Sequence, residues 1–201
     1  MNKCECEKNY EYHEIVDCIT SALDARDPYT GNHSRRVSDM ACILCGYLGF
    51  NAEKTQEIHI SAHLHDIGKI GVRDSILLKA DALTDEEWVL MKEHSQIGAD
   101  ILSKSPHFSR IAAVILHHHE RYDGKGYPFG AKGNEIPEGS RIIAVCDSID
   151  AMASARAYRD ALPLDVCYNE IDINIGKMYD PEFAKVMLAH WDAVEKIYIG
   201  S

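Results

Sequence analysis

The chain has 201 residues, 46% of them hydrophobic, and a formal net charge of −11. This length suits one domain with a single core, and the composition is typical of a globular protein rather than a disordered one. The negative charge disfavours binding to nucleic acid polymers or anionic membranes, which depend on a basic surface. The N-terminus has no apolar signal segment, and no stretch approaches the roughly 18 consecutive apolar residues that a membrane span requires. We therefore expect a cytoplasmic protein.

The seven cysteines are an odd number in a chain with no export signal, which favours reduced thiols over a disulfide framework. Cys42 and Cys45 form a C-x-x-C motif, but they lie within an apolar helical stripe. We therefore predict that both thiols are packed in the core rather than bound to a metal.

The first half of the chain has a helical hydrophobic pattern. Apolar residues recur at helical spacing over 33–50, which predicts a helix with His33 in its first turn. The sequence TDEE at 84–87 fits a capping box that opens another helix. His94 is expected near the end of that helix or on the next one.

The second half continues this pattern around one long loop. The apolar stripe over 111–118 predicts that His118 points into the core. Residues 121–139 are dense in glycine and proline and predict a loop of about twenty residues, a length that is usually functional. A helix is predicted over 140–162, and Pro181 is predicted to open a final helix. No segment shows strand alternation, so the sequence predicts an all-α single domain.

Ionisable side chains gather in the apolar segment HLHDIGKI at residues 63–70. On an α-helix His65, Asp66 and Lys69 would share one face, whereas His59, His63 and Asp66 would share another. Either set could present imidazole and carboxylate groups to a metal ion. Periodicity alone does not choose between them.

Further metal-binding residue types lie elsewhere in the chain. His118 to Glu120 follow the inward stripe, Asp147 and Asp150 are spaced i, i+3 on an apolar helix, and His33 begins another helix. Histidine and carboxylate together suit iron, manganese, nickel or zinc, and the lack of cysteine argues against a structural zinc site. A carboxylate such as Asp66 can bridge two ions, which together can generate a hydroxide and clamp a phosphoryl group.

The segments HLHDIGKIGV and HHERYDGKGYP, in this order, resemble the HD-GYP family. This is a branch of the HD-superfamily metal-dependent phosphohydrolases, whose members typically hydrolyse cyclic di-GMP. The second segment is the more specific, and the resemblance covers about residues 20 to 190. It implies an all-α HD-superfamily domain with a GYP loop at 20–201, after an N-terminal tail and the start of the first helix at 1–19.

The resemblance also chooses between the two helix faces and implies two divalent ions, with iron expected first and manganese second. One ion would be held by His33, His65, Asp66 and Asp147. The other would be held by His94, His118 and His119, with Asp66 bridging the pair. Family members with three ions carry a glutamate four residues before the first histidine, and Tyr29 at that position here predicts a two-metal site.

By the same resemblance, Asp66 and Lys69 are the expected catalytic residues, with Lys69 contacting the scissile phosphate. The expected substrate-binding residues are those of the GYP loop, Gly126, Tyr127 and Pro128, and two basic residues, Arg156 and Arg159. The implied reaction is hydrolysis of cyclic di-GMP to linear pGpG by a metal-bridged hydroxide. Whether a second round yields GMP depends on how the opened product lies in the pocket.

Two alternatives stay open. A chain with these motifs could bind cyclic di-GMP without cutting it and signal to a partner, for example a diguanylate cyclase (GGDEF) domain. It could also hydrolyse another cyclic dinucleotide, such as cyclic GMP-AMP. The apolar helix near Trp191 could be core or a homodimer face.

The remaining polar residues are expected to support the site, to pack in the fold or to lie on the surface. Glu120 and Asp123 could orient metal-bound imidazoles or cap the loop. His117 is expected in a supporting or exposed position. His59 and His63 are expected to be packing or surface residues, and His13, His107 and His190 are assigned no role.

Overall fold

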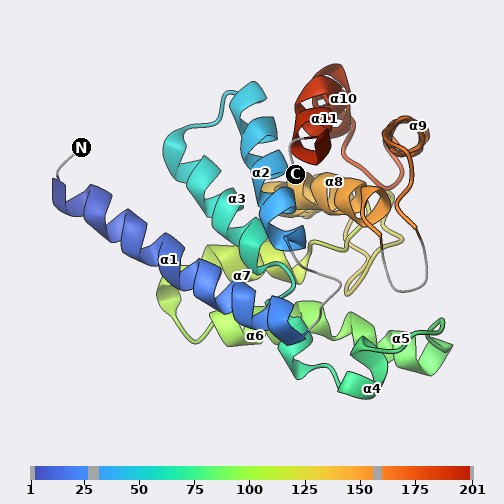
Figure 1. Cartoon of the computed structure of the whole chain (residues 1–201), viewed down its shortest axis with the longest axis horizontal. Helices are drawn as coiled ribbons and strands as arrows, with labels where there is room; N and C mark the ends of the chain where they lie inside the picture. Colours follow the sequence, from blue (N-terminus) through green and yellow to red (C-terminus); the bar gives the residue numbers. More distant parts are fainter. Residues whose placement is uncertain (1–2, 27–31, 156–159, 200–201) are drawn as a thin grey trace.

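The computed structural model describes residues 3–26, 32–155 and 160–199, and the secondary structure in these ranges is helical (Figure 1). One isolated bridge, between Ile175 and Tyr179, is the only β pairing among them. The α-helices are α1 (Lys3–Arg26), α2 (His33–Tyr47), α3 (Ala52–Leu64), α4 (Asp74–Leu77), α5 (Asp85–Lys92), α6 (His94–Leu102), α7 (Ser109–Leu116), α8 (Glu138–Ala153), α9 (Leu164–Ile173), α10 (Pro181–Ala189) and α11 (Trp191–Ile199). The 3₁₀ helices are η1 (Ile67–Gly71), η2 (Pro106–Phe108) and η3 (Gly133–Glu135). The all-α prediction is confirmed.

Two hydrophobic clusters hold the helices together. The first packs α2, α8, α10 and α11 around residues such as Met40, Leu44, Ile142, Met187 and Val194. The second packs α1, η1, α6 and α7 around residues such as Val16, Ile67, Leu102, Ile111 and Ile115. Both α3 and α7 contribute to the two clusters. Residues at the ends of these helices therefore lie where the two clusters meet.

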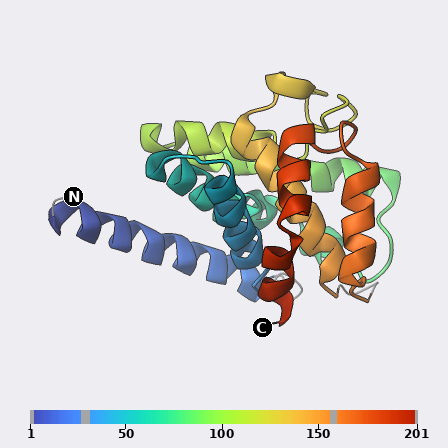
Figure 2. The same ribbon diagram turned by 90° about the horizontal axis from the view of Figure 1, so that it is seen from above.

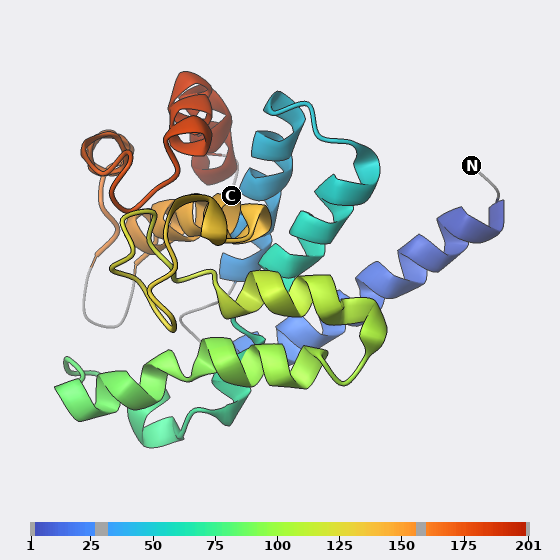
Figure 3. The same ribbon diagram turned by 180° about the vertical axis from the view of Figure 1, so that it is seen from behind.

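Only part of the first helix, α1, packs against the rest of the fold. Its later part packs against α3 and η1. Its N-terminal part projects beyond the other helices (Figures 2 and 3). Among the described residues, no helix has both the length and the apolar character needed to cross a membrane.

Several predicted helix starts are confirmed. Thr84 caps α5 as predicted: its hydroxyl accepts from the Glu87 backbone N–H at 3.3 Å, and its own N–H donates to the Glu87 carboxylate at 2.8 Å. The next helix, α6, begins at His94, and α2 begins at His33. Residues 117–137 form the predicted long loop, interrupted only by η3.

Two helix predictions need correction in the second half, and one helix was missed. The helix predicted over 140–162 ends at Ala153, because Ser154 has an extended backbone (φ −108°, ψ 143°). The predicted final helix is broken at His190, where φ is −123° and ψ is 36°, and the break lets α11 turn Val194 into the first cluster. No helix was predicted for α9.

The segment HLHDIGKI also differs from the helix assumed for it. The α-helix ends at Leu64, and Asp66 caps the 3₁₀ helix η1. The prediction that one α-helical face carries His65, Asp66 and Lys69 is therefore wrong. A 3₁₀ helix has three residues per turn, so residues three apart, such as Asp66 and Lys69, still lie on the same side.

Gly68 allows η1 to approach α6 closely. A Cβ atom at this position would lie 1.8 Å from the His94 carbonyl oxygen and 2.5 Å from the Gly98 backbone nitrogen. Both atoms are backbone and cannot move aside as a flexible side chain could. Gly68 thus brings the Asp66 segment against the helix that starts at His94.

We expect Gly68→Ala to lower the free energy of unfolding by about 1–3 kcal/mol or more, because overpacking forces backbone shifts. Gly46→Ala is the matched control. Gly46 is exposed on α2 with no atom within 4 Å of an added Cβ, so alanine there should stabilise by about 0.5–1 kcal/mol. Urea unfolding of both variants measures the difference. Equal stability of Gly68→Ala and the parent would contradict the close approach.

Candidate metal centre

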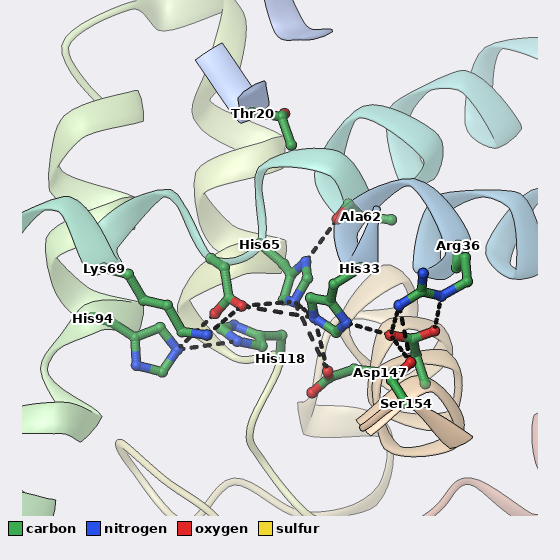
Figure 4. Close-up of polar contacts among 12 residues, drawn as sticks. Thr20, His33, Arg36, Ala62, His65, Lys69, His94, His118, Asp147 and Ser154 are labelled. Atoms are coloured by element: carbon green, nitrogen blue, oxygen red, sulfur yellow. Dashed lines mark hydrogen bonds and ion pairs between the residues drawn. The ribbon is translucent and has the colours of Figure 1, made fainter. Parts of the chain in front are cut away.

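The seven metal ligands expected from the sequence come together in the structure. Figure 4 shows five of them, His33, His65, His94, His118 and Asp147. The seven ligands lie at helix ends, except for one on α8. His33 begins α2, His65 and Asp66 join α3 to η1, His94 begins α6, His118 and His119 follow α7, and Asp147 lies on α8. Two groups of donor atoms each fit within 4.8 Å: His33, His65 and Asp66, and His94, His118 and His119.

The imidazoles in each group turn their Nε2 atoms toward one another. In the first group the Nε2 atoms of His33 and His65 are 3.2 Å apart, and His33 Nε2 is 3.4 Å from Asp147 Oδ1. In the second group His94 Nε2 lies 3.3 Å from His118 Nε2 and 3.1 Å from His119 Nε2. Each group therefore presents several nitrogens to one small space.

Asp66 stands between the two groups. Its Oδ2 is 3.4 Å from His65 Nε2, and its Oδ1 is 3.5 Å from His94 Nε2. Lys69 reaches back along η1 and places Nζ 2.7 Å from Asp66 Oδ2. One buried carboxylate thus faces both groups and carries an ammonium group beside it.

Three of the imidazoles are oriented by carbonyls at helix ends. The Nδ1 atoms of His65, His94 and His118 lie 2.7, 2.8 and 2.5 Å from carbonyl oxygens three residues earlier in the chain. These carbonyls belong to the last turns of α3, α5 and α7, where a carbonyl lacks its full helical pairing and can accept from a side chain; the Ile115 carbonyl also accepts a long bond, 3.4 Å, from the His118 backbone N–H. A carbonyl only accepts, so Nδ1 carries the proton and the lone pair of the neutral ring is on Nε2.

His33 is oriented by a carboxylate instead. Its Nδ1 lies 2.7 Å from Asp150 Oδ2, and Asp150 also accepts from Arg36 Nε and the Tyr198 hydroxyl, both at 2.5 Å. Burial alone would raise the pKa of Asp150, but hydrogen bonds from His33 and Arg36 hold it well below its usual value. The i, i+3 spacing to Asp147 singled out Asp150 in the sequence. Nothing in the sequence pointed to Tyr198.

The donor set fits divalent cations. Burial, together with the neighbouring His94 and His65, lowers the pKa of His118 to about 3, so this ring stays neutral. Burial also disfavours charge on His65, but Asp66 and Asp147 outweigh it and raise its pKa to about 9. The two carboxylates thus attract positive charge to a place where imidazole lone pairs converge. A bound cation would balance the charge of the carboxylates and accept the imidazole lone pairs.

The GYP loop closes against the second group. The Tyr127 backbone N–H donates to the His119 carbonyl at 3.2 Å, and the two rings lie 4.7 Å apart. A Cβ at Gly126 would lie 2.3 Å from the Arg121 backbone nitrogen, so this position needs glycine. Burial raises the pKa of Tyr127, as do the charges of Asp66 and Asp147, so the phenol keeps its proton. Pro128 follows Tyr127 in the same loop.

Other predicted residues have structural roles or lie outside the described part of the chain. Glu120 accepts from the Phe129 backbone N–H at 2.8 Å, and Asp123 from Arg121 at 2.8 Å, which favours loop capping over imidazole orientation. His117 is half-buried, and its Nδ1 bonds the Ala113 carbonyl. Arg156, Arg159 and Tyr29 lie outside the described residues.

Sequence and structure comparisons agree with this geometry. Residues 17–183 match the HD domain family. A cyclic di-GMP phosphodiesterase of Thermotoga maritima is 41% identical over 187 residues, covering 92% of this chain and 51% of that protein. A 3'3'-cGAMP-specific phosphodiesterase 2 of Vibrio cholerae is 34% identical over 181 residues, covering 89% of this chain and 35% of that protein.

Among solved structures, the HD-GYP-type protein Bd1817 of Bdellovibrio bacteriovorus superposes with a TM-score of 0.65 at 20% identity. The match covers 89% of this chain and 60% of that one. The chain therefore belongs to the HD domain family. Within that family, its two motifs resemble those of the HD-GYP branch. It spans about half the length of the Thermotoga maritima relative.

We expect Asp150→Asn to weaken metal binding at the first group about 10–100-fold, because the carboxylate that orients His33 is lost. Asp192→Asn is the matched control, since Asp192 forms an exposed pair with Lys196 at 2.9 Å. Metal retained after dialysis against graded chelator concentrations measures the effect. Identical retention by Asp150→Asn and Asp192→Asn would show that Asp150 does not support the metal ligands.

Proposed function

We propose that this protein is a metal-dependent phosphodiesterase that hydrolyses cyclic di-GMP to linear pGpG. The observation that carries the proposal is the placement of Asp66 between two imidazole groups, with the Lys69 ammonium 2.7 Å from the same carboxylate. The 41% identical Thermotoga maritima relative, a cyclic di-GMP phosphodiesterase, supports it independently.

The ligand assignment follows the two groups of donors. His33, His65 and Asp147 would hold one ion, and His94, His118 and His119 the other, with Asp66 shared. Bound divalent ions would supply Lewis-acid stabilisation of the phosphoryl oxygens and a water of lowered pKa. Iron is our first choice and manganese the second, because imidazole and carboxylate donors suit both.

The chain's own residues would position the phosphodiester and offset its charge. Lys69 places its ammonium 2.7 Å from the shared carboxylate, so it is positioned to stabilise charge that develops on the phosphoryl oxygens. This local positive charge allows an anionic ligand to bind despite the net charge of −11. Tyr127, as a neutral phenol, can donate a hydrogen bond from the loop side.

Cyclic GMP-AMP is the alternative substrate. The 34% identical Vibrio cholerae relative is specific for 3'3'-cGAMP, a cyclic dinucleotide with the same phosphodiester chemistry and one different base. The metal groups and Lys69 would act on either compound. Base recognition therefore decides between them, and we propose cyclic di-GMP first because the more similar relative acts on it.

We expect the anaerobically purified chain to carry two catalytic ions and to convert cyclic di-GMP to pGpG. Asp66→Ala should abolish turnover and lower the metal content together, because the carboxylate faces both groups. Asp100→Ala, an exposed aspartate on α6, is the control and should retain both properties. Metal analysis followed by chromatographic separation of cyclic di-GMP, pGpG and GMP gives the result.

Each outcome of this experiment has a distinct meaning. Full activity and metal content in Asp66→Ala would refute the ligand assignment. Cyclic di-GMP that is bound but uncut at full metal occupancy would make the chain a receptor. Faster cleavage of cyclic GMP-AMP in a parallel assay would reassign the substrate while leaving the reaction type intact.

Lys69→Ala should leave the metal content unchanged and lower kcat about 10²–10³-fold, the usual effect of removing one group that stabilises the transition state. Lys104→Ala, an exposed lysine after α6, is the control and should behave as the parent. The assay compares kcat and metal content in the same preparations. A parallel loss of metal in Lys69→Ala would mean that Lys69 supports the site structurally.

A further inference from the structure

A third histidine group lies outside the candidate metal centre. It consists of His13 on α1 and His59 and His63 on α3, whose donor atoms fit within 4.8 Å of one another. From the sequence, His59 and His63 formed one of two possible metal-binding faces and, once the family resemblance favoured the other face, were expected to be packing or surface residues. His13 was assigned no role. The proposed reaction uses none of them. Packing of α1 against α3 brings them together, and the Thr20 hydroxyl lies 3.4 Å from the His63 carbonyl beside them.

The rings of His13 and His59 are oriented as in the candidate metal centre. Their Nε2 atoms face each other at 2.7 Å. Their Nδ1 atoms point outward, to Asp17 Oδ2 at 3.1 Å and to Ser38 Oγ at 2.5 Å. Ser38 uses its own hydroxyl proton toward the His59 carbonyl, so its oxygen accepts from His59 Nδ1. Both outward nitrogens therefore carry protons, and both Nε2 lone pairs of the neutral rings face inward.

His63 has a buried ring nitrogen that the described part of the chain leaves without a hydrogen-bond partner. The residue is only 6% exposed, and its Nδ1 has no hydrogen-bond partner among the described residues. Its ring meets that of His59 edge-on, with centroids 4.7 Å apart, and that of His13 at 5.4 Å. A buried nitrogen without a partner is costly, and a ligand beside it would remove that cost.

A shared proton is the simplest rival explanation for the 2.7 Å pair. A proton between His13 and His59 would satisfy those two nitrogens, but it would leave His63 Nδ1 without a partner. A metal ion could instead take one nitrogen from each of the three rings, whose donor atoms lie within 4.8 Å of one another. The Cys42 thiol lies 3.1 Å from His59 Nδ1, on the outward side of the ring, and so is not positioned as a fourth ligand.

We propose that His13, His59 and His63 bind a divalent cation of the zinc class, separate from the catalytic ions, that fastens α1 to α3. Three neutral imidazoles with room for a water form a common zinc ligand set. Asp17 and Ser38 orient two of the rings, as is usual for the outer partners of metal-bound histidine. The ion would fix the N-terminal helix to the helix that leads into His65 and Asp66.

The test uses the full chain equilibrated with zinc and passed over a weak chelating resin. Substitution of His13 should have little effect on folding, because its side chain is 44% exposed. His13→Ala should retain one zinc ion fewer per chain than the parent. His107→Ala, an exposed histidine in η2, is the matched control and should retain the parental number. Circular dichroism confirms that the variants are folded, and zinc should raise the Tm of the parent more than that of His13→Ala.

The same comparison in an Asp66→Ala background separates this site from the proposed catalytic one. If the site exists, Asp66→Ala still binds zinc, and adding His13→Ala removes that ion. Equal zinc content in the folded parent and His13→Ala proteins would overturn the proposal and leave the catalytic assignment untouched. His59→Gln should reproduce the loss, and retention of the ion in that variant would equally count against the site.

Discussion

The candidate metal centre depends on the direction in which each imidazole holds its proton. Helix ends fix this direction, because the last carbonyls of a helix lack helical partners and are free to accept from a side chain. His65, His94 and His118 each use such a carbonyl three residues earlier, and so turn Nε2 inward. A histidine in the middle of a helix would find those carbonyls already bonded. For these three histidines, the position at a helix boundary therefore sets which nitrogen faces the site.

Burial of charge imposes a second constraint. Asp66 is 4% exposed and Asp150 is fully buried, and an unpaired carboxylate in either place would be strongly destabilising. Asp66 is balanced by Lys69 from its own 3₁₀ turn, so that pairing is local. Asp150 is balanced by His33 and Arg36 from α2 and by Tyr198 from α11. The C-terminal helix therefore contributes to the orientation of a metal ligand near the start of the described domain.

These two constraints explain what the sequence could and could not predict. The capping box at Thr84 and the start of α2 at His33 depend on local residues, and both were predicted correctly. The choice of His65 and Asp66 over His59 and His63 came from the family resemblance, because the chain leaves the α-helix at Leu64 and periodicity assumed that it did not. The end of α8 at Ala153 and the roles of Arg36 and Tyr198 arise from contacts distant in sequence.

The third histidine group shows what distinguishes a catalytic centre from a simple binding site in this fold. In both, several imidazole nitrogens face one another while partners on the other ring nitrogen orient most of the rings, so both suit a cation. Only the candidate catalytic centre has a buried carboxylate that faces two donor groups with an ammonium beside it. The group on α1 and α3 consists of imidazoles alone, and the Asp17 carboxylate is engaged at Nδ1 of His13. One ion held in that way can tie two helices together, but it lacks the shared carboxylate and the cation that phosphoryl chemistry requires.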